Sequence, residues 1–561
     1  MLQENLIKMY EQSFREHREM SAVTDYFSGE SYSYYGFAKE IAKLHILFDE
    51  AGVKRGDKIA LVGRNTPRWC AVYIATMTYG AVIVPIMQTF TSNDITHIVN
   101  HSESRLLFAG DAHWQSLDTD RMPLLEAALS LKRLDVVYEK EGSAVAEALK
   151  TLDDDFKAKY PNGFKVEDIK FNAIPNEEMI LLNYTSGTTG SSKGVMLSVN
   201  NLTGNMVFAR DMVNPDTGTN YYSAGGRTLS FLPLAHAYGC AFDFLAQLVV
   251  GGHITLLGRM PSPKILVDAM QVVKPTIVCS VPLILEKIYR KMIMPMLEQG
   301  PMSIAMKIPL LNTALYSVIK YKLMASFGGE VQIFIIGGAP MNQETESFLR
   351  KINFPLTIGY GMTECAPLIS YEHPKYFKNG SCGRYLPGLM EAKIVSKDPQ
   401  NIPGEILVHG ENVMMGYYKN EAATQAVLEP DGWLHTGDMG IMDEDGTLYI
   451  KGRCKTMILT GTGQNIYPEE IEDKLNNLPL VMESLIVERK GVLTALIFPD
   501  YDQAKQEGIQ GEALDKMMAD NIIELNKMVA SYEKIGRYEL MESEFEKTPK
   551  RSIKRYLYQD K

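Results

Sequence analysis

The sequence of 561 residues has no apolar run long enough to cross a membrane. Its two longest apolar stretches are Val72–Met87, broken by a glycine and a proline, and Phe242–Leu257, broken by two glycines and a histidine. A spanning helix needs about 20 consecutive apolar residues. The first twenty residues have the pattern of an amphipathic helix and lack the order of a signal peptide. We therefore expect a soluble, cytoplasmic protein, whose surface is still free to touch the inner membrane peripherally.

Positive charge and paired cysteines are also scarce. Lys and Arg total 57 against 68 Asp and Glu, which gives a formal net charge of −11. Proteins that bind nucleic acid through their overall field need positive charge, so this balance argues against a nucleic-acid partner. The six cysteines show no CxxC or other metal-ligand spacing. They indicate reduced thiols of an intracellular protein.

Strand-like apolar runs alternate with helical patterns over most of the chain. Lys58–Gly63 precedes the helical Thr66–Tyr79, and Val331–Gly337 precedes Asn342–Ile352. This alternation predicts parallel sheets covered by helices. After about residue 390, short strands between Gly, Asp and Asn turns predict an antiparallel β region, and a further β/α pattern begins near residue 455. We expect an α/β protein with a large N-terminal domain of parallel helix-covered sheets plus a β-rich subdomain, residues 1–454, and a small α+β C-terminal domain, residues 455–561.

A segment rich in glycine and hydroxyl groups follows the apolar run Met179–Tyr184 and precedes an expected helix whose N-cap is Ser198. It reads TSGTTGSSKG over residues 185–194. Glycines let backbone N–H groups approach an anion closely, and the hydroxyls and the lysine add donors and positive charge. The segment is not a Walker A loop, because Ser192 stands where that motif, started at Gly187, requires glycine. A flexible surface loop is the competing interpretation, but the order of residues after a strand favours polyphosphate binding.

This loop resembles the phosphate-binding signature of the adenylate-forming superfamily, which includes acyl-CoA synthetases, peptide-synthetase adenylation domains and luciferases. Further motifs follow in the family order: FLPLAH at 231–236, GGAP at 337–340, GYGMTE at 359–364, GWLHTGD at 432–438 and GR at 452–453. SVP at 280–282 and FGG at 327–329 look most like long-chain fatty acid–CoA ligases. Because the ordered motifs cover most of the chain from residue 180 onward, a chance match is implausible.

The resemblance implies ATP-dependent activation of a fatty acid. A carboxylate is a poor electrophile, and its transfer to AMP gives an acyl-adenylate that a thiol can attack. The implied reaction therefore uses ATP, Mg²⁺ and CoA, and it releases pyrophosphate and then AMP. Two alternatives stay open: delivery of the acyl group to a separate carrier protein, and a nucleotide- or acyl-binding relative without turnover. Relatives that activate amino acids place an aspartate near the FLPLAH motif to hold the substrate ammonium. Asp243 lies seven residues after His236, within an apolar run, so we interpret it as structural and expect a substrate without an amine.

The resemblance also implies roles for individual residues. The phosphates of ATP would contact Thr185, Ser186, Gly187, Thr188, Thr189, Gly190 and Lys193. Catalytic roles would fall to Thr363 on phosphate, to Glu364 on Mg²⁺ with Thr185 as a second ligand, and to His236 near the substrate carboxylate. The adenosine would contact Gly338, Ala339, Tyr360, Gly361, Asp438 and Arg453, with Tyr360 stacking on the base and Asp438 accepting from the ribose. Taken singly, each of these residues would be an ordinary turn or core residue.

The C-terminal region carries the remaining implied roles and one departure from the family. Lys455 would be the hinge of a mobile C-terminal domain, and Gly461 and Gly463 would line the path of the CoA thiol. The family's adenylating lysine lies in a TPxxK stretch, where this sequence has Ser552. In an extended segment residues 550, 552 and 554 share one face, so Lys554 or Lys550 can replace it. We favour Lys554 as the catalytic lysine; a basic, solvated tail is the competing interpretation.

Overall fold

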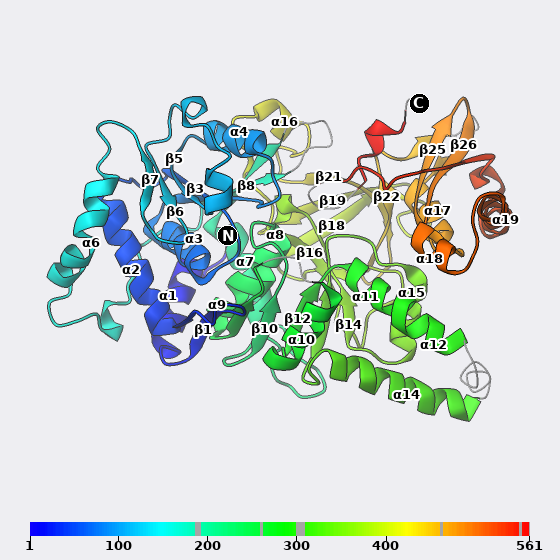
Figure 1. Cartoon of the computed structure of the whole chain (residues 1–561), viewed down its shortest axis with the longest axis horizontal. Coiled ribbons are helices and arrows are strands. Elements are labelled where there is room, and N and C mark those ends of the chain that lie inside the picture. The colour runs from blue at the N-terminus through cyan, green and yellow to red at the C-terminus, as the bar shows by residue number, and fades with distance from the viewer. Residues whose placement is uncertain (186–191, 259–261, 299–308, 460–463, 549–552, 560–561) are drawn as a thin grey trace.

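The computed structural model describes residues 1–185, 192–258, 262–298, 309–459, 464–548 and 553–559. An eight-stranded sheet forms the N-terminal part of the large body, at the left of Figure 1, in the order β20-β9-β8-β4-β3-β5-β6-β7. Its strands are β3 (Lys58–Val62), β4 (Val82–Ile86), β5 (Ser104–Ala109), β6 (Ala127–Ser130), β7 (Val136–Glu139), β8 (Met179–Thr185), β9 (Lys193–Ser198) and β20 (Gly416–Tyr417). Strands β3, β4, β5, β6 and β8 run parallel, whereas β8 and β9 form an antiparallel hairpin.

Helices beside this sheet begin and end where the local sequence dictates. They include α1 (Leu6–Glu16), α2 (Tyr34–Glu50), α3 (Pro67–Tyr79), α4 (Ser92–Ser102) and α6 (Val145–Lys159). In α3, the side chain of Thr66 accepts a hydrogen bond from the backbone N–H of Trp69, and Pro67 occupies the first turn. The helix ends at Gly80, whose φ of 96° lies in the left-handed region that favours glycine.

The second large sheet has seven strands, in the order β14-β13-β12-β10-β11-β1-β2. Its strands are β1 (Ser21–Asp25), β2 (Ser31–Ser33), β10 (Arg227–Ser230), β11 (His253–Leu256), β12 (Ile277–Ser280), β13 (Ile333–Ile336) and β14 (Leu356–Ile358). Only the β1–β2 pair is antiparallel among the pairings described for this sheet. The helices between and beside its strands include α7 (Val199–Arg210), α9 (Ala246–Val250), α10 (Pro263–Val273), α11 (Pro282–Ile288), α12 (Met294–Glu298), α14 (Pro309–Ser326) and α15 (Gln343–Lys351). One continuous hydrophobic core joins the two large sheets.

The β-rich part follows directly. It consists of an antiparallel sheet β18 (Met390–Val395), β19 (Gly404–Gly410), β21 (Leu434–Met442), β22 (Leu448–Arg453), and a small sheet β15 (Tyr360–Gly361), β16 (Leu368–Tyr371), β17 (Arg384–Tyr385). The sheet β18–β22 lies between the large body and the last segment of the chain in Figure 1. The chain thus passes from the large body through this sheet to the C-terminal lobe.

The last hundred residues form a lobe at the upper right of Figure 1. Its elements are β23 (Ile458–Leu459), β24 (Asn465–Ile466), α17 (Pro468–Leu475), β25 (Val481–Arg489), β26 (Val492–Pro499), α18 (Tyr501–Gln506), α19 (Glu512–Met528) and β27 (Arg537–Leu540). The lobe has apolar clusters of its own, formed by residues from Ile458 to Tyr558. The exact limits 1–454 and 455–561 stay a prediction.

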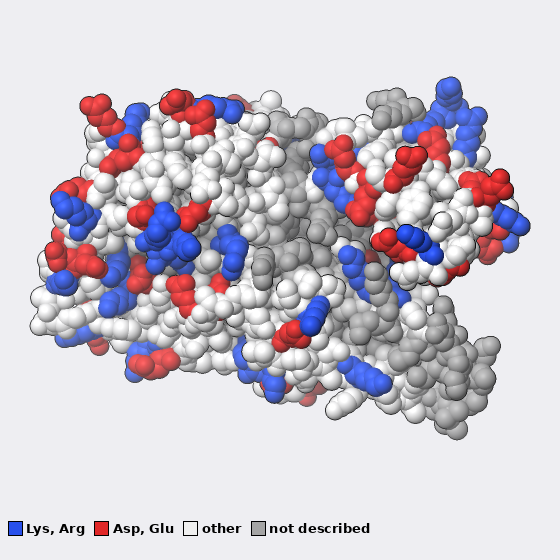
Figure 2. All heavy atoms as spheres, in the orientation of Figure 1, with Lys and Arg blue, Asp and Glu red and all other residues white. Residues whose placement is uncertain are grey.

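The expected fold class is confirmed, since parallel helix-covered sheets, a β-rich part and a small α+β lobe follow one another along the chain. One element was missed, because the sequence interpretation placed a helix directly after the glycine-rich loop. Strand β9 comes first there, and α7 then begins after Ser198, whose side chain caps it by accepting from the N–H of Asn201, as expected. Within the described ranges, no helix has the length and apolar character that crossing a bilayer demands. Basic and acidic side chains are interspersed over the face seen in Figure 2.

Candidate functional site

The two ends of the glycine-rich loop are held together by the β8–β9 hairpin. Thr185, the last residue of β8, pairs with Lys193, the first residue of β9. Five predicted phosphate-binding residues, from Ser186 to Gly190, lie outside the described residues. The flanking strands nevertheless fix where the loop leaves and rejoins the sheet.

A residue that the sequence analysis missed, Tyr417, joins this hairpin to the predicted magnesium ligand. Tyr417 lies on β20 and pairs with Val195 of β9. The amine of Lys193 lies 4.6 Å from the centroid of the Tyr417 ring, within the range of a cation–π contact. The Tyr417 hydroxyl donates a hydrogen bond of 2.8 Å to Oε1 of Glu364. Burial and then the Glu364 carboxylate raise the pKa of Tyr417, so the hydroxyl stays protonated and acts as a donor.

Glu364 and Thr363 belong to a short 3₁₀ turn, Thr363–Cys365, that follows β15. The carbonyl of Glu364 accepts a hydrogen bond of 2.8 Å from the backbone N–H of Met414, which fixes the turn beside β20. Gly361 precedes this turn for a steric reason: a Cβ there would lie 2.1 Å from the carbonyl oxygen of Pro367. Only glycine allows the two chains to approach so closely.

Tyr360, Asp438 and Arg453 form a second connected group. The hydroxyl of Tyr360 donates to Oδ2 of Asp438 at 2.8 Å, and Nε of Arg453 lies 3.2 Å from Oδ1 of the same carboxylate. Asp438 is buried, whereas the Arg453 side chain is 64% exposed. Burial raises the pKa of Asp438, and the Arg453 guanidinium opposes that rise. The three predicted residues therefore come together as a carboxylate between a phenol and a guanidinium.

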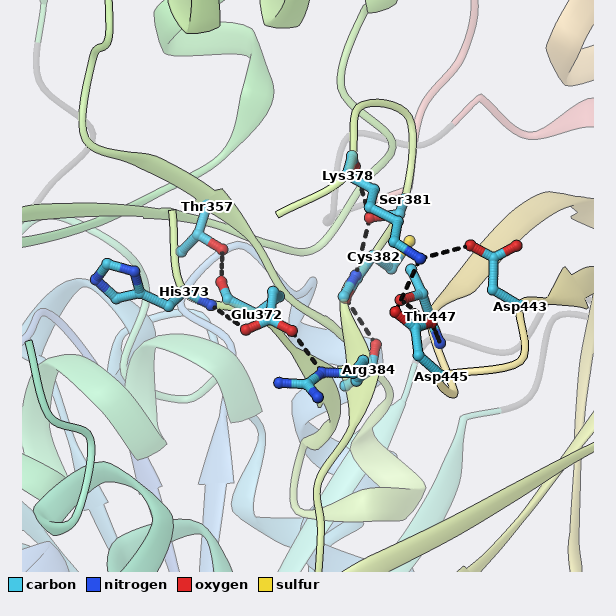
Figure 3. Close-up of polar contacts among 12 residues, drawn as sticks. Thr357, Glu372, His373, Lys378, Ser381, Cys382, Arg384, Asp443, Asp445 and Thr447 are labelled. Atoms are coloured by element: carbon cyan, nitrogen blue, oxygen red, sulfur yellow. Dashed lines mark hydrogen bonds and ion pairs between the residues drawn. The ribbon is translucent and has the colours of Figure 1, made fainter. Parts of the chain in front are cut away.

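A polar network links the adjoining strands and turns (Figure 3). Lys378 bridges Asp443 at 2.9 Å and Asp445 at 2.8 Å, both in the turn that joins β21 to β22. Hydrogen bonds from Lys378 and Thr447 lower the pKa of Asp445 to about 2. In the same network, the hydroxyl of Thr357 on β14 donates to the backbone carbonyl of Glu372 at 2.5 Å. The network thus ties together the strands that carry Asp438 and Arg453 and the strand that leads to Tyr360.

The GGAP motif meets Tyr238, which lies two residues after the FLPLAH motif. Gly337 packs against the ring of Tyr238, because a Cβ at Gly337 would lie 3.2 Å from that ring. Gly338 has a φ of 85°, and both Gly338 and Ala339 are exposed beyond the end of β13. His236 caps the short helix α8 (Ala237–Gly239), where its Nδ1 accepts from the N–H of Tyr238 at 3.3 Å. The motifs predicted to hold the base and the substrate carboxylate are therefore neighbours.

Asp243 lies in the π-helical segment Cys240–Leu245 and is fully buried. Its Oδ1 accepts from the hydroxyl of Thr228 at 3.4 Å, and desolvation raises its pKa to about 8. A carboxyl that is buried in this way and bonded to a strand has the character of a packing residue. The interpretation of Asp243 as structural therefore agrees with its environment.

The C-terminal candidates lie in the lobe. The amine of Lys554 is 3.4 Å from Oε2 of Glu546, so in the described part of the chain its ion pair is with the lobe and not with Glu364. The neighbouring Arg555 pairs with Glu472 and, at 3.5 Å, with Glu469 of α17. Lys455 is exposed in the turn after β22. Lys550, Ser552, Gly461 and Gly463 lie outside the described residues.

Polar contacts join the lobe to the large body. Asn342, which caps α15, donates to Asp473 at 2.9 Å and to Asn477 at 2.6 Å. Arg290 donates to the same Asn477 at 3.2 Å. Among the described residues these contacts are polar bonds, and the apolar clusters of the lobe and of the large body are separate. Polar contacts of this kind let one domain move on another.

Comparison with known proteins identifies the family. The sequence model of the family described as AMP-binding enzyme matches residues 10–418, and the chain belongs to that family. It is 29% identical over 550 residues to a long-chain-fatty-acid–CoA ligase of Mycobacterium bovis, covering 91% of this chain and 87% of that protein. It is 28% identical to a long-chain-fatty-acid–CoA ligase of Rattus norvegicus, covering 81% of this chain and 64% of the rat protein. The solved o-succinylbenzoate–CoA synthetase of Bacillus subtilis, in complex with ATP and a magnesium ion, has the same fold, with a TM-score of 0.73, 21% identity and 98% of both chains covered.

Proposed function

We propose that this chain is an ATP-dependent acid–CoA ligase that activates a long-chain fatty acid through an acyl-adenylate. The observation that carries the proposal is the connection from Lys193 through Tyr417 to Glu364, which brings the end of the glycine-rich loop to the predicted metal ligand. A phosphate chain and a divalent cation require this juxtaposition. The names of the Mycobacterium bovis and Rattus norvegicus relatives support a long-chain fatty acid as the substrate.

The predicted ligands Glu364 and Thr185 suit Mg²⁺, which substrate phosphates help to bind, better than a metal ion that is held by protein side chains alone. No group of three or more His, Cys, Asp or Glu side chains within the described ranges could hold a metal ion. Mg²⁺ prefers one or two carboxylates together with substrate phosphates, so Glu364 with the Thr185 hydroxyl and the ATP phosphates is a suitable set. When bound, Mg²⁺ offsets the negative charge on the phosphates and on the leaving pyrophosphate.

In the first half-reaction, the fatty acid carboxylate attacks the α-phosphorus of ATP, and pyrophosphate leaves. Lys193 and the loop residues hold the phosphates, while Thr363 orients the α-phosphate. Asp438 accepts from the ribose hydroxyls, and its contact with Tyr360 keeps the carboxylate aimed at the nucleoside. Lys554 approaches the α-phosphate when the lobe turns, and it neutralises charge that develops there. His236 orients the substrate carboxylate.

In the second half-reaction, the CoA thiolate attacks the acyl carbonyl, and AMP leaves with the electron pair of the broken bond. Lys455 is the proposed hinge of the rotation between the halves, and the loop with Gly461 and Gly463 lines the thiol path. The polar character of the Asn342 contacts with Asp473 and Asn477 supports such a rotation, because these bonds exchange readily with water. We place the reaction in the cytoplasm.

One experiment separates this proposal from its two alternatives. ATP–pyrophosphate exchange is measured with carboxylic acids of increasing chain length, and AMP release is then measured with and without CoA. Long-chain-dependent exchange together with CoA-dependent AMP release is the expected result. Exchange without CoA-dependent release would instead favour a carrier protein as the acceptor. No exchange with any acid would favour a binding protein, an alternative that Ser552 motivates; the variant Glu364→Gln serves as the inactive control.

A further inference from the structure

Helix α14 has an apolar stripe on the side that faces solvent. Its exposed residues Ala314, Val318, Tyr321 and Ala325 follow one another at helical spacing and form this stripe, beside the exposed Thr313, Ser317 and Lys322. Val318 is 49% exposed and Tyr321 is 75% exposed. The opposite side is apolar too, since Ile319 and Leu323 are buried against the core. A surface helix normally has a polar outer face, so the stripe needs an explanation.

The neighbouring helix α10 extends this apolar surface. The side chain of Gln271 on α10 donates to the backbone carbonyl of Ala325 on α14, so the two helices touch at that point. Val272, the next residue of α10, is 71% exposed. We define the α14 surface as Val272, Ala314, Val318, Tyr321 and Ala325. In Figure 1 α14 lies along the lower edge of the molecule, far from the N-terminal sheet.

The charge on helix α14 is opposite in sign to that of the whole protein, whose net charge is −11. Helix α14 contains Lys320 and Lys322 and no acidic residue. Lys322 is exposed beside Tyr321. An apolar stripe flanked by lysines complements a membrane with anionic lipid headgroups, because long lysine side chains reach the headgroups while apolar residues enter the interface.

A second copy of the chain fits this surface less well. A symmetric dimer places the same surface against itself, which would bring the lysines of α14 toward those of the partner. Like charges at a contact oppose association. The position in the fold also favours lipid: α14 lies in the connection between β12 and β13, and β13 leads directly to Gly338 and Ala339 of the candidate site.

We propose that the α14 surface docks the protein on an anionic lipid surface, from which it takes its acyl substrate. Binding to lipid is inferred from the α14 surface alone, whereas delivery of the acyl substrate rests on the proposed function. A long acyl chain partitions into the bilayer, because burial of its methylene groups away from water is favourable. Docking on the lipid surface therefore shortens the path of the substrate through water.

Vesicle flotation tests the docking directly. The full-length protein is mixed with vesicles of phosphatidylcholine alone or of phosphatidylcholine with phosphatidylglycerol, at low and high salt. We expect binding to the anionic vesicles that weakens with salt. The double variant Val318→Ser/Tyr321→Ser should bind on the order of tenfold more weakly, because it removes apolar area from the interface. Lys320→Glu/Lys322→Glu should lose the preference for phosphatidylglycerol.

A matched control is Val395→Ser/Tyr376→Ser, which changes a valine and a tyrosine that are 58% and 56% exposed elsewhere. It should bind the vesicles like the unchanged protein. Equal binding by Val318→Ser/Tyr321→Ser and by this control would overturn the proposal, as would no binding to either vesicle. A concentration-dependent dimer that Val318→Ser/Tyr321→Ser abolishes would assign the surface to a second copy and contradict docking on lipid.

The ligase assay keeps this test separate from the proposed function. With fatty acid dispersed in detergent, Val318→Ser/Tyr321→Ser should release AMP at the rate of the unchanged protein. With fatty acid supplied in anionic vesicles, it should be slower. If neither the unchanged protein nor the variant releases AMP, the proposed function fails. The flotation result still decides whether the α14 surface binds lipid.

Discussion

The hydroxyl of Tyr417 lies 2.8 Å from Oε1 of Glu364, although 53 residues separate them in the chain. The bond arises because β20 adds to the edge of the first large sheet next to β9, while the turn that holds Glu364 follows the end of the second large sheet. One carboxylate oxygen is thus engaged, and Oε2 can face a cation. The Tyr417 ring meanwhile contacts the amine of Lys193. Tyr417 therefore positions both the predicted phosphate-binding lysine and the candidate metal ligand.

Replacement of Tyr417 by Phe should impair adenylation more than folding. The variant keeps the ring beside Lys193 and removes only the hydrogen bond to Glu364. A hydrogen bond to a charged group contributes about 1.5–3 kcal/mol, so the exchange rate should fall on the order of tenfold or more. The apparent requirement for Mg²⁺ should rise, because Glu364 loses its fixed orientation. ATP–pyrophosphate exchange over a series of Mg²⁺ concentrations measures both effects.

Tyr418→Phe provides the matched control for this substitution. Tyr418 is the next residue, and its hydroxyl donates to Glu103 at 3.1 Å rather than to Glu364. We expect an unchanged requirement for Mg²⁺ in this variant. An equal change in the two variants would mean that Tyr417 acts through general packing and not through Glu364.

Arg453→Gln should shift the acid limb of the adenylation pH profile to higher pH. Burial raises the pKa of Asp438, and Arg453 is the group that opposes this rise. Without the guanidinium, the pKa of Asp438 rises further, and a higher pH is needed to ionise the carboxylate that we propose accepts from the ribose. The pH dependence of ATP–pyrophosphate exchange checks this expectation. An acid limb that stays in place, with only a lower maximum, would show that Arg453 binds the nucleotide without tuning Asp438.

His435 couples the stability of the β18–β22 sheet to pH. Its Nδ1 lies 2.9 Å from Glu405 and its Nε2 lies 2.9 Å from Glu429. The Glu405 contact is the largest cause of the raised pKa of His435; burial opposes this rise, and the Glu429 contact adds to it. A raised histidine pKa stabilises the folded state below the unfolded pKa of about 6.5, and this contribution is lost as pH rises through the folded pKa.

His435→Gln should therefore lower the melting temperature at about pH 6 and change it little at about pH 9. Thermal unfolding of both proteins across that range provides the measurement. A decrease of the same size at both pH values would assign the effect to lost packing and not to the charge on the imidazole.

Much of the fold follows from local sequence. Runs such as Lys58–Val62, buried on both faces, can only be strands of a covered parallel sheet. Thr66 and Ser198 each have a side chain that accepts from the N–H three residues later, so both helix starts can be predicted from short-range chemistry. Strand β9 was missed because it is specified by pairing with β8 across the loop and with β20, which lies more than 200 residues away. Pairing at such a distance leaves no local signal.

The candidate site likewise contains residues that local sequence predicts and one residue, Tyr417, that it does not. Glycines and charged residues in ordered motifs pointed to Glu364, Tyr360 and Asp438, and the hydrogen bond between Tyr360 and Asp438 then joined two of those motifs. Tyr417 carried no such signal, since a tyrosine after glycine is typical of many strands. Its partners come from distant segments, and the arrangement emerges only when the two large sheets pack together. Position in three dimensions, rather than residue type, gives Tyr417 its role.

Lys554→Ala should slow adenylation and spare thioester formation. Lys554 is paired with Glu546, while the neighbouring Arg555 is anchored on α17 by Glu472. This anchor would carry Lys554 with α17 when the lobe turns, and loss of one such electrostatic contact typically costs on the order of 10²–10³ in rate. ATP–pyrophosphate exchange reports the first half-reaction, and AMP release from preformed acyl-adenylate with CoA reports the second. Lys550→Ala is the matched control, because it removes another lysine of the same segment. A strong decrease in exchange for Lys550→Ala and none for Lys554→Ala would transfer the role to Lys550.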